Sequence, residues 1–110
     1  MTNLIQITDS SFESEVLKAG RPCIVGFWAP WSVTASVITS AMREFSDRYA
    51  NDVKCVYINV DEDPRTPATY AIRTLPTLLL FEEGEVTRRI SGAAPRDRIE
   101  QLFLATTELR

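Results

Sequence analysis

The sequence predicts an α/β domain in which a mixed sheet of four to five strands is covered by helices on both faces. Two nearly continuous apolar runs, residues 23–29 and 53–60, are typical of strands buried on both faces. A long amphipathic pattern lies between them, and a hairpin turn and a second amphipathic pattern follow. With 110 residues, 45% of them hydrophobic, we expect a single domain over residues 1–110.

The first half of the chain alternates strands and helices. Residues 4–8 alternate in polarity and predict a short strand. Residues 8–22 then predict a helix that starts with a capping box of Ser10 and Glu13 and ends at Gly20. After the strand 23–29 comes the longest helix, whose apolar stripe should face the sheet: Val37, Ile38, Ala41, Met42, Phe45 and Tyr49.

An acidic turn, residues 61–64, closes the strand 53–60, and only a short helix is expected within residues 66–73. The three successive carboxylates of this turn are hard oxygen donors and raise the alternative of a metal site. Adjacent side chains in a turn diverge, whereas metal loops space their ligands around the ion. We therefore favour a solvated turn that caps the short helix.

The second half predicts a hairpin and a final helix. A strand from about Thr77, a turn around Gly84 and an alternating edge strand, residues 86–91, form the hairpin. Arg88, Arg89, Arg96 and Arg98 raise the alternative of a basic patch for an acidic partner. We favour protection of the exposed strand edge by the first two and surface charge in the first turn of the final helix for the other two. The final helix begins near Pro95 and repeats one apolar side: Ile99, Leu102, Phe103, Thr106 and Leu109.

Composition excludes several classes of function. The formal charge is −3 and no long run of like charge occurs, so a nucleic-acid partner is not expected. The absence of histidine removes Ser-His and Cys-His pairs and histidine-ligated zinc, and we predict no cofactor or metal. The N-terminus lacks a signal-peptide pattern and every apolar stretch is shorter than ~18 residues, which predicts a cytoplasmic protein without membrane contact.

Four segments in the same order resemble the thioredoxin family over essentially the whole chain. They are "VGFWAPW" (25–31), "INVDEDP" (58–64), "YAIRTLPTLLLFEEGEV" (70–86) and "SGA" (91–93). The resemblance implies the thioredoxin fold and a parent activity of protein thiol-disulfide exchange. It also implies a cis peptide before Pro76, a bond nearly confined to proline.

The resemblance further implies a binding groove for a protein or peptide partner. In the family, the proline loop lies beside the active site and offers backbone hydrogen bonds to an extended peptide. The positions that inherit this role, with their neighbours in the groove, are Thr74, Leu75, Pro76, Trp31, Gly92 and Ala93.

The chain departs from the family at its reactive centre. The family reads W-C-x-x-C after the strand, and the helix N-terminus lowers the pKa of the first thiol. Here these two positions are Ser32 and Ala35. The family's buried acid falls on Gly26 and its partner lysine on Tyr57, and we expect the Tyr57 ring to fill the space that Gly26 leaves.

Two residue types offer substitutes for the missing thiols, and both are disfavoured. The resemblance implies that Gly26 and Tyr57 face one another across adjacent parallel strands. Since side chains alternate along a strand, Cys55 should then share their face and Cys23 should point to the opposite one. We therefore expect two buried, unpaired thiols. Ser32 has no base beside it and is expected, with Thr34, to cap the long helix; a weaker alternative is an anion held at that helix N-terminus.

Three functions remain. The first is a redox-inactive thioredoxin-like protein that binds a peptide through the groove. The alternative is a thiol-disulfide oxidoreductase whose two cysteines have been replaced by Ser32 and Ala35, substitutions that an experimenter would choose to silence thiols. A designed silencing would have left the acid and lysine beneath the site in place, and Gly26 and Tyr57 argue against it. The third is a structural subunit of a larger assembly.

Overall fold

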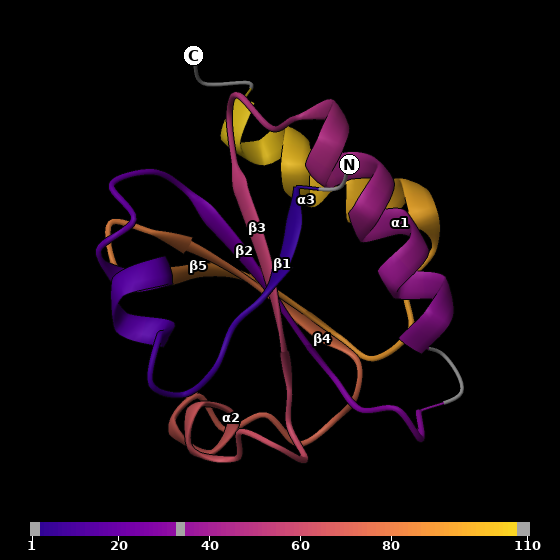
Figure 1. Ribbon diagram of the computed structural model, residues 1–110. Coiled ribbons are helices and arrows are strands. Elements are labelled where there is room, and N and C mark those ends of the chain that lie inside the picture. Colours follow the sequence, from indigo (N-terminus) through magenta and orange to yellow (C-terminus); the bar gives the residue numbers. More distant parts are fainter. Residues whose placement is uncertain (1–2, 33–34, 108–110) are drawn as a thin grey trace.

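The computed structural model describes residues 3–32 and 35–107. Five strands form one mixed sheet in the order β1-β3-β2-β4-β5 (Figure 1). β1, β3 and β2 run parallel, β4 is antiparallel to β2, and β5 is antiparallel to β4. The strands are β1 (Leu4–Gln6), β2 (Cys23–Trp28), β3 (Lys54–Asn59), β4 (Thr77–Glu82) and β5 (Glu85–Ser91).

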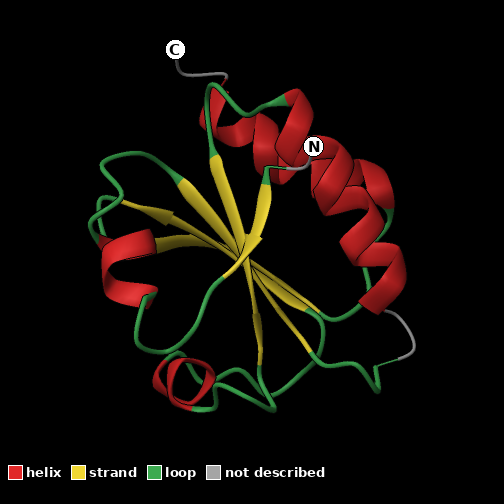
Figure 2. Ribbon diagram, in the orientation of Figure 1, coloured by secondary structure: helices red, strands yellow, loops and turns green. Residues whose placement is uncertain are grey.

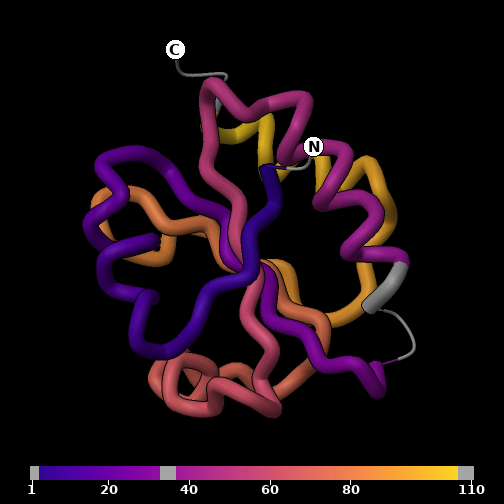
Figure 3. Tube along the Cα trace, viewed as in Figure 1, coloured from indigo at the N-terminus to yellow at the C-terminus, as the bar shows by residue number. Residues whose placement is uncertain are grey.

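Helices cover both faces of the sheet, as the sequence predicts (Figure 2). α1 (Ala35–Arg48) and α3 (Arg96–Thr107) pack together on one face. The short π-helical turn η1 (Glu13–Leu17) and α2 (Arg65–Thr69) lie on the other. The tube in Figure 3 shows how the first strand lies beside β3, although more than forty residues separate them in the chain.

The sheet divides the core into two apolar clusters. On the α1 and α3 side, Phe45 and Phe103 are fully buried, with ring centroids 5.6 Å apart. On the η1 and α2 side, Phe12 and Phe81 make an edge-to-face contact, also at 5.6 Å. A sheet that is covered on both faces accounts for the uninterrupted apolar character of β2.

The predicted apolar stripe of α1 is correct except at Val37. Ile38, Ala41, Met42 and Phe45 are buried, whereas the Val37 side chain is 66% exposed. Val37 lies in the first turn of α1, on the side where Ala94 and Arg96 line a surface hollow with it, and so it stays exposed. In α3 the predicted buried positions 99, 102, 103 and 106 are confirmed, and Leu109 lies outside the described residues.

The predicted alternation of the last strand is wrong. Within β5 only Ile90 is buried, and a register shift interrupts the pairing with β4 between Leu80 and Phe81. β5 lies at the edge of the sheet, where Arg88 and Arg89 are exposed and the Arg89 guanidinium donates to the Tyr70 carbonyl at 2.8 Å. The prediction of an edge strand itself is confirmed.

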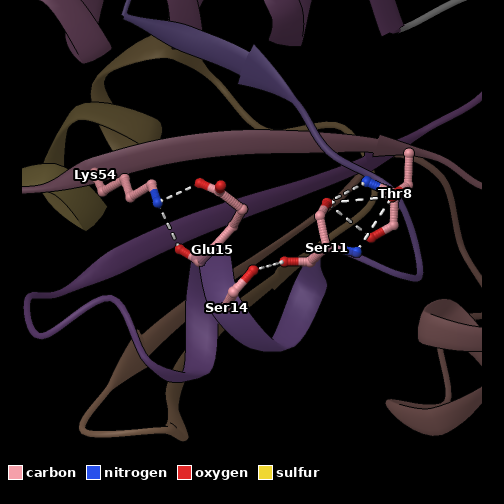
Figure 4. A network of polar contacts seen from close by, with 5 residues as sticks. All are labelled: Thr8, Ser11, Ser14, Glu15 and Lys54. Carbon is pink, nitrogen blue, oxygen red and sulfur yellow. Dashed lines mark hydrogen bonds and ion pairs between the residues drawn. The ribbon is translucent and has the colours of Figure 1, made fainter.

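The start of the first helical turn also differs from the prediction. Thr8 and Ser11 form the reciprocal pair: the Thr8 N–H donates to Ser11 Oγ at 2.9 Å and the Ser11 N–H donates to Thr8 Oγ1 at 3.2 Å (Figure 4). The capping box of Ser10 and Glu13 is therefore wrong. Residues 8–11 form this hydrogen-bonded turn, and the helical segment that follows it, η1, is five residues long.

Lys54 ties this turn to the sheet. Its ammonium donates to the carbonyl oxygen of Glu15 at 2.7 Å and to Glu15 Oε1 at 2.6 Å (Figure 4). Lys54 is the first residue of β3, directly opposite Cys23 in the register. The contact fixes η1 over the start of β2 and β3.

The carboxylate that caps α2 comes from Asp9 rather than from the acidic turn. Asp9 Oδ1 accepts the Thr66 N–H at 2.8 Å, and Oδ2 accepts the Arg65 N–H at 3.0 Å. Burial raises the pKa of Asp9, but the hydrogen bonds from Thr66 and Arg65 outweigh it, so the net pKa lies below its ordinary value. Asp63 is instead an acceptor for the N–H of Asp9.

Candidate functional site

The candidate site begins where β2 ends. The chain leaves the sheet at Trp28, turns with a hydrogen bond from the Ser32 N–H to the Ala29 carbonyl at 3.1 Å, and enters α1 at Ala35. Trp31, in this turn, is 67% exposed. Ser32 is half-buried, and Thr34, the other predicted capping residue, lies outside the described residues.

Asp61 holds the exposed tryptophan. Trp31 Nε1 donates to Asp61 Oδ2 at 2.9 Å. This contact was not predicted, although the sequence carries a signal for it. β2 and β3 are parallel neighbours that pair Trp28 with Asn59, so the segments that follow them leave the same edge of the sheet. The acidic turn after β3 thus supplies an acceptor for the aromatic turn after β2.

The two cysteines are not suited to replace the thiols that the turn lacks. Both are buried and free. Cys55 belongs to the cluster on the Tyr57 face and Cys23 to the opposite cluster, which confirms their predicted orientations. Burial raises the pKa of Cys23 to about 12 and raises that of Cys55 well above its ordinary value. At neutral pH neither cysteine therefore provides an attacking thiolate.

Beneath the site, the space beside Gly26 is occupied by the apolar side chains of Met42 and Leu78. Gly26 and Tyr57 are directly paired in the register, as expected. A Cβ on Gly26 would meet Met42 Sδ at 2.8 Å and Met42 Cε at 3.0 Å. The expectation that Tyr57 fills this space is wrong, because the thioether of Met42 occupies it and the Tyr57 ring packs on Trp28 instead, at 5.8 Å between centroids.

The loop before β4 reaches the same edge of the sheet. Phe27 pairs with Thr77, which places residues 74–76 beside the end of β2. The Leu75–Pro76 peptide bond is cis. The Gly92 N–H donates to the Pro76 carbonyl at 2.7 Å, and Gly92 adopts a φ of 80°, a conformation that favours glycine.

These contacts bring part of the predicted binding set together. Thr74 and Gly92 adjoin, since a Cβ on Gly92 would lie 3.5 Å from Thr74 Cγ2. Leu75 is half-buried and Ala93 exposed. Within the part of the chain that the structure describes, neither the N–H nor the carbonyl of Leu75 makes a hydrogen bond. Trp31 reaches this edge from β2, and the contact of its indole N–H is with Asp61.

Comparison with known proteins agrees with this architecture. A family model described as thioredoxin matches residues 3–105. The chain belongs to the thioredoxin family. It is 38% identical over 96 residues to the thioredoxin of Acidithiobacillus ferridurans, covering 87% of this chain and 89% of that protein. It is 36% identical over 101 residues to thioredoxin 1 of Nostoc sp., covering 92% and 94% of the two chains. It is 36% identical over 99 residues to the thioredoxin of Haemophilus influenzae, covering 90% and 92%.

Membership of the thioredoxin family makes this chain a relative of thiol-disulfide oxidoreductases, although its two cysteines, Cys23 and Cys55, do not form a C-x-x-C pair. The fold and the five-stranded sheet are those that the resemblance implies. Among the described helices, none is long and apolar enough to cross a membrane.

Proposed function

We propose that the protein binds an extended segment of a partner protein and performs no thiol-disulfide exchange. One observation carries the proposal: the thiol-free segment from Ser32 to Ala35 follows the exposed Trp31 and leaves the sheet beside Leu75, whose backbone has no hydrogen-bond partner among the described residues. These features support a surface for a protein partner that carries no thiol.

The chemistry of exchange supports the inactive half of this proposal. Thiol-disulfide exchange needs a thiolate that attacks the substrate disulfide and a second thiol that resolves the mixed disulfide formed. The two thiols of the chain, Cys23 and Cys55, are buried on opposite faces of the sheet and their pKa values are raised. A reducing cytoplasm, the compartment we propose, keeps both as inert apolar side chains.

The geometry of the loop supports the binding half. An extended peptide that pairs with Leu75 gains hydrogen bonds to a backbone N–H and carbonyl that have no partner among the described residues. Trp31 supplies a large aromatic contact beside this loop. Because Asp61 already orients the indole, less side-chain freedom is lost on binding.

A capture experiment tests the proposal. The parent protein, Trp31→Ala and Ile5→Ala are immobilised and exposed to the same cell extract. Ile5 is a matched control, because its side chain is 54% exposed on β1, an edge strand that β3 separates from β2. We expect Trp31→Ala to lose the captured partners and Ile5→Ala to keep them. Equal capture by all three proteins contradicts the proposal and favours a structural subunit that docks through another face.

The names of the relatives favour a second candidate, an oxidoreductase whose thiols have been replaced. A Ser32→Cys, Ala35→Cys double variant separates the two. If the chain is an oxidoreductase with two substitutions, the variant reduces protein disulfides at a rate comparable with an active thioredoxin. Under our proposal it stays slow, because Gly26 and Met42 leave no acid beneath the second thiol.

A further inference from the structure

A surface hollow of about 520 Å³ lies between α1 and the turn that follows β2. It is distinct from the proposed peptide groove, since none of residues 74–76 and 92–93 lines it. Its volume falls within the range of about 300–1,000 Å³ in which small-molecule sites lie. The hollow therefore has the size of a ligand site, and its lining indicates the kind of ligand.

Two aromatic rings line one side of the hollow. Trp28 and Tyr57 are both half-buried and meet with 5.8 Å between ring centroids at an interplanar angle of 62°. Tyr57 contributes to this aromatic surface because it stands where the resemblance implies a lysine. Rings of this kind provide a large apolar contact for a flat ligand. This side favours an aromatic or other planar body.

The remaining polar lining can donate hydrogen bonds and carries one positive charge. Arg43 is exposed, and its guanidinium makes no ion pair or hydrogen bond with the described residues. By contrast, Arg48, one turn further along α1, bonds to Glu44 and Glu100. No aspartate or glutamate is among the described residues that line the hollow. The hydroxyls that line it with Arg43 are those of Ser32, Thr39 and Ser40.

The indole Nε1 of Trp28 is shielded from solvent and has no hydrogen-bond acceptor among the described residues, so Trp28 serves the hollow through its ring. The Tyr57 hydroxyl also makes no hydrogen bond within the described part of the chain. A site with a guanidinium, several hydroxyls and no carboxylate is matched to a ligand that carries an oxyanion.

We propose that this hollow binds a small aromatic carboxylic acid, with its ring against Trp28 and Tyr57 and its carboxylate on the Arg43 guanidinium. A small molecule fits better than an extended peptide, because the wall of the hollow is α1, whose backbone groups are bonded within the helix and leave no edge for strand pairing. Thr39, Ser40 and Arg43 lie at helical spacing on one side of α1 and can approach the same carboxylate.

Tryptophan fluorescence provides the test. The chain has two tryptophans, so a Trp31→Phe variant leaves Trp28, which lines the hollow, as the only reporter. This variant is titrated with benzoate and with benzamide, its uncharged analogue of similar shape. We expect a saturable change in Trp28 emission with benzoate and binding weaker by about tenfold with benzamide, which lacks the charge-assisted hydrogen bond.

Two arginine variants in the same background locate the carboxylate. Arg43→Gln should weaken benzoate binding by about tenfold. Arg98→Gln, a change to an exposed arginine on α3, should leave it unchanged. The proposal is overturned if benzoate gives no saturable change, if benzamide binds as tightly as benzoate, or if the two arginine variants behave alike. None of these results depends on whether the separate peptide groove binds a partner.

Discussion

A Gly26→Ala substitution should destabilise the protein, although it adds only one methyl group to a strand. The added Cβ meets Met42 Sδ at 2.8 Å and Leu78 Cδ2 at 3.4 Å, and the first distance is too short without a shift of the thioether. Overpacking of a core costs about 1–3 kcal/mol, and this contact falls toward the lower end because Met42 Sδ and Cε form the flexible end of their side chain. Removal of a glycine from the unfolded chain offsets roughly 0.4–1 kcal/mol. We expect a net loss of about 0.5–1 kcal/mol in the free energy of unfolding.

The cause is assigned by double-mutant cycles in urea denaturation. Met42→Ala alone should cost about 2–5 kcal/mol because it opens a cavity in the core. In that background Gly26→Ala has room, so its effect should become neutral or stabilising by up to about 1 kcal/mol. In a Tyr57→Ala background its cost should persist. The reasoning is refuted if Gly26→Ala matches the parent, or if Tyr57→Ala relieves the cost and Met42→Ala does not.

Three further predictions address the cysteines, the cap of α2 and the tryptophan turn. At pH 8 the native protein should react slowly with a thiol reagent, because the raised pKa values keep Cys23 and Cys55 protonated and burial limits access. Both thiols should react once the protein is denatured. Rapid reaction of two thiols per native chain contradicts this prediction. Asp9→Ala should lose about 1 kcal/mol of stability at pH 7. Because the folded pKa of Asp9 is lowered, its contribution to stability is complete above the ordinary value of 3.8 and is lost as pH falls through the folded value. The free energies of unfolding of parent and variant should therefore converge in acid. A constant difference down to low pH contradicts the assignment. Asp61→Ala should shift the indole N–H resonance of Trp31 with little change in melting temperature, and an unshifted resonance contradicts the hydrogen bond.

The sequence was sufficient for the order of the elements and for the faces of the buried strands. The apolar runs of β2 and β3 predict a sheet covered on both sides, which local periodicity displays directly. The placement of Cys23 and Cys55 on opposite faces combined period-2 alternation with the strand pairing that the family resemblance implies.

What the sequence could not supply were contacts decided by three-dimensional packing. Nothing in the spacing of Gly26 and Met42 shows that a helical thioether, rather than the neighbouring ring of Tyr57, enters the space beside a strand glycine. The cap of α2 by Asp9 likewise joins segments that are distant in the chain. Short-range capping patterns compete for the same donors, and only the folded chain shows which acceptor is near enough.

The same limit applies to the candidate site. The turn around Trp31 and the loop at Pro76 were predicted through the family resemblance. The support of Trp31 by Asp61 and the hollow beside Arg43 were not predicted, because they arise where separate segments leave the sheet or pack on it. The residues that repeat a known pattern were therefore found, and the surroundings specific to this chain were missed.

Amide hydrogen exchange at Leu75 tests the central claim most directly. A partner segment recovered by capture is added to the protein, and exchange of the Leu75 N–H is compared with and without it. In the free protein this amide makes no hydrogen bond among the described residues. Our account predicts that its exchange slows strongly when the segment binds, because the segment pairs with it as a strand does. Saturating binding that leaves exchange at Leu75 unchanged contradicts the account.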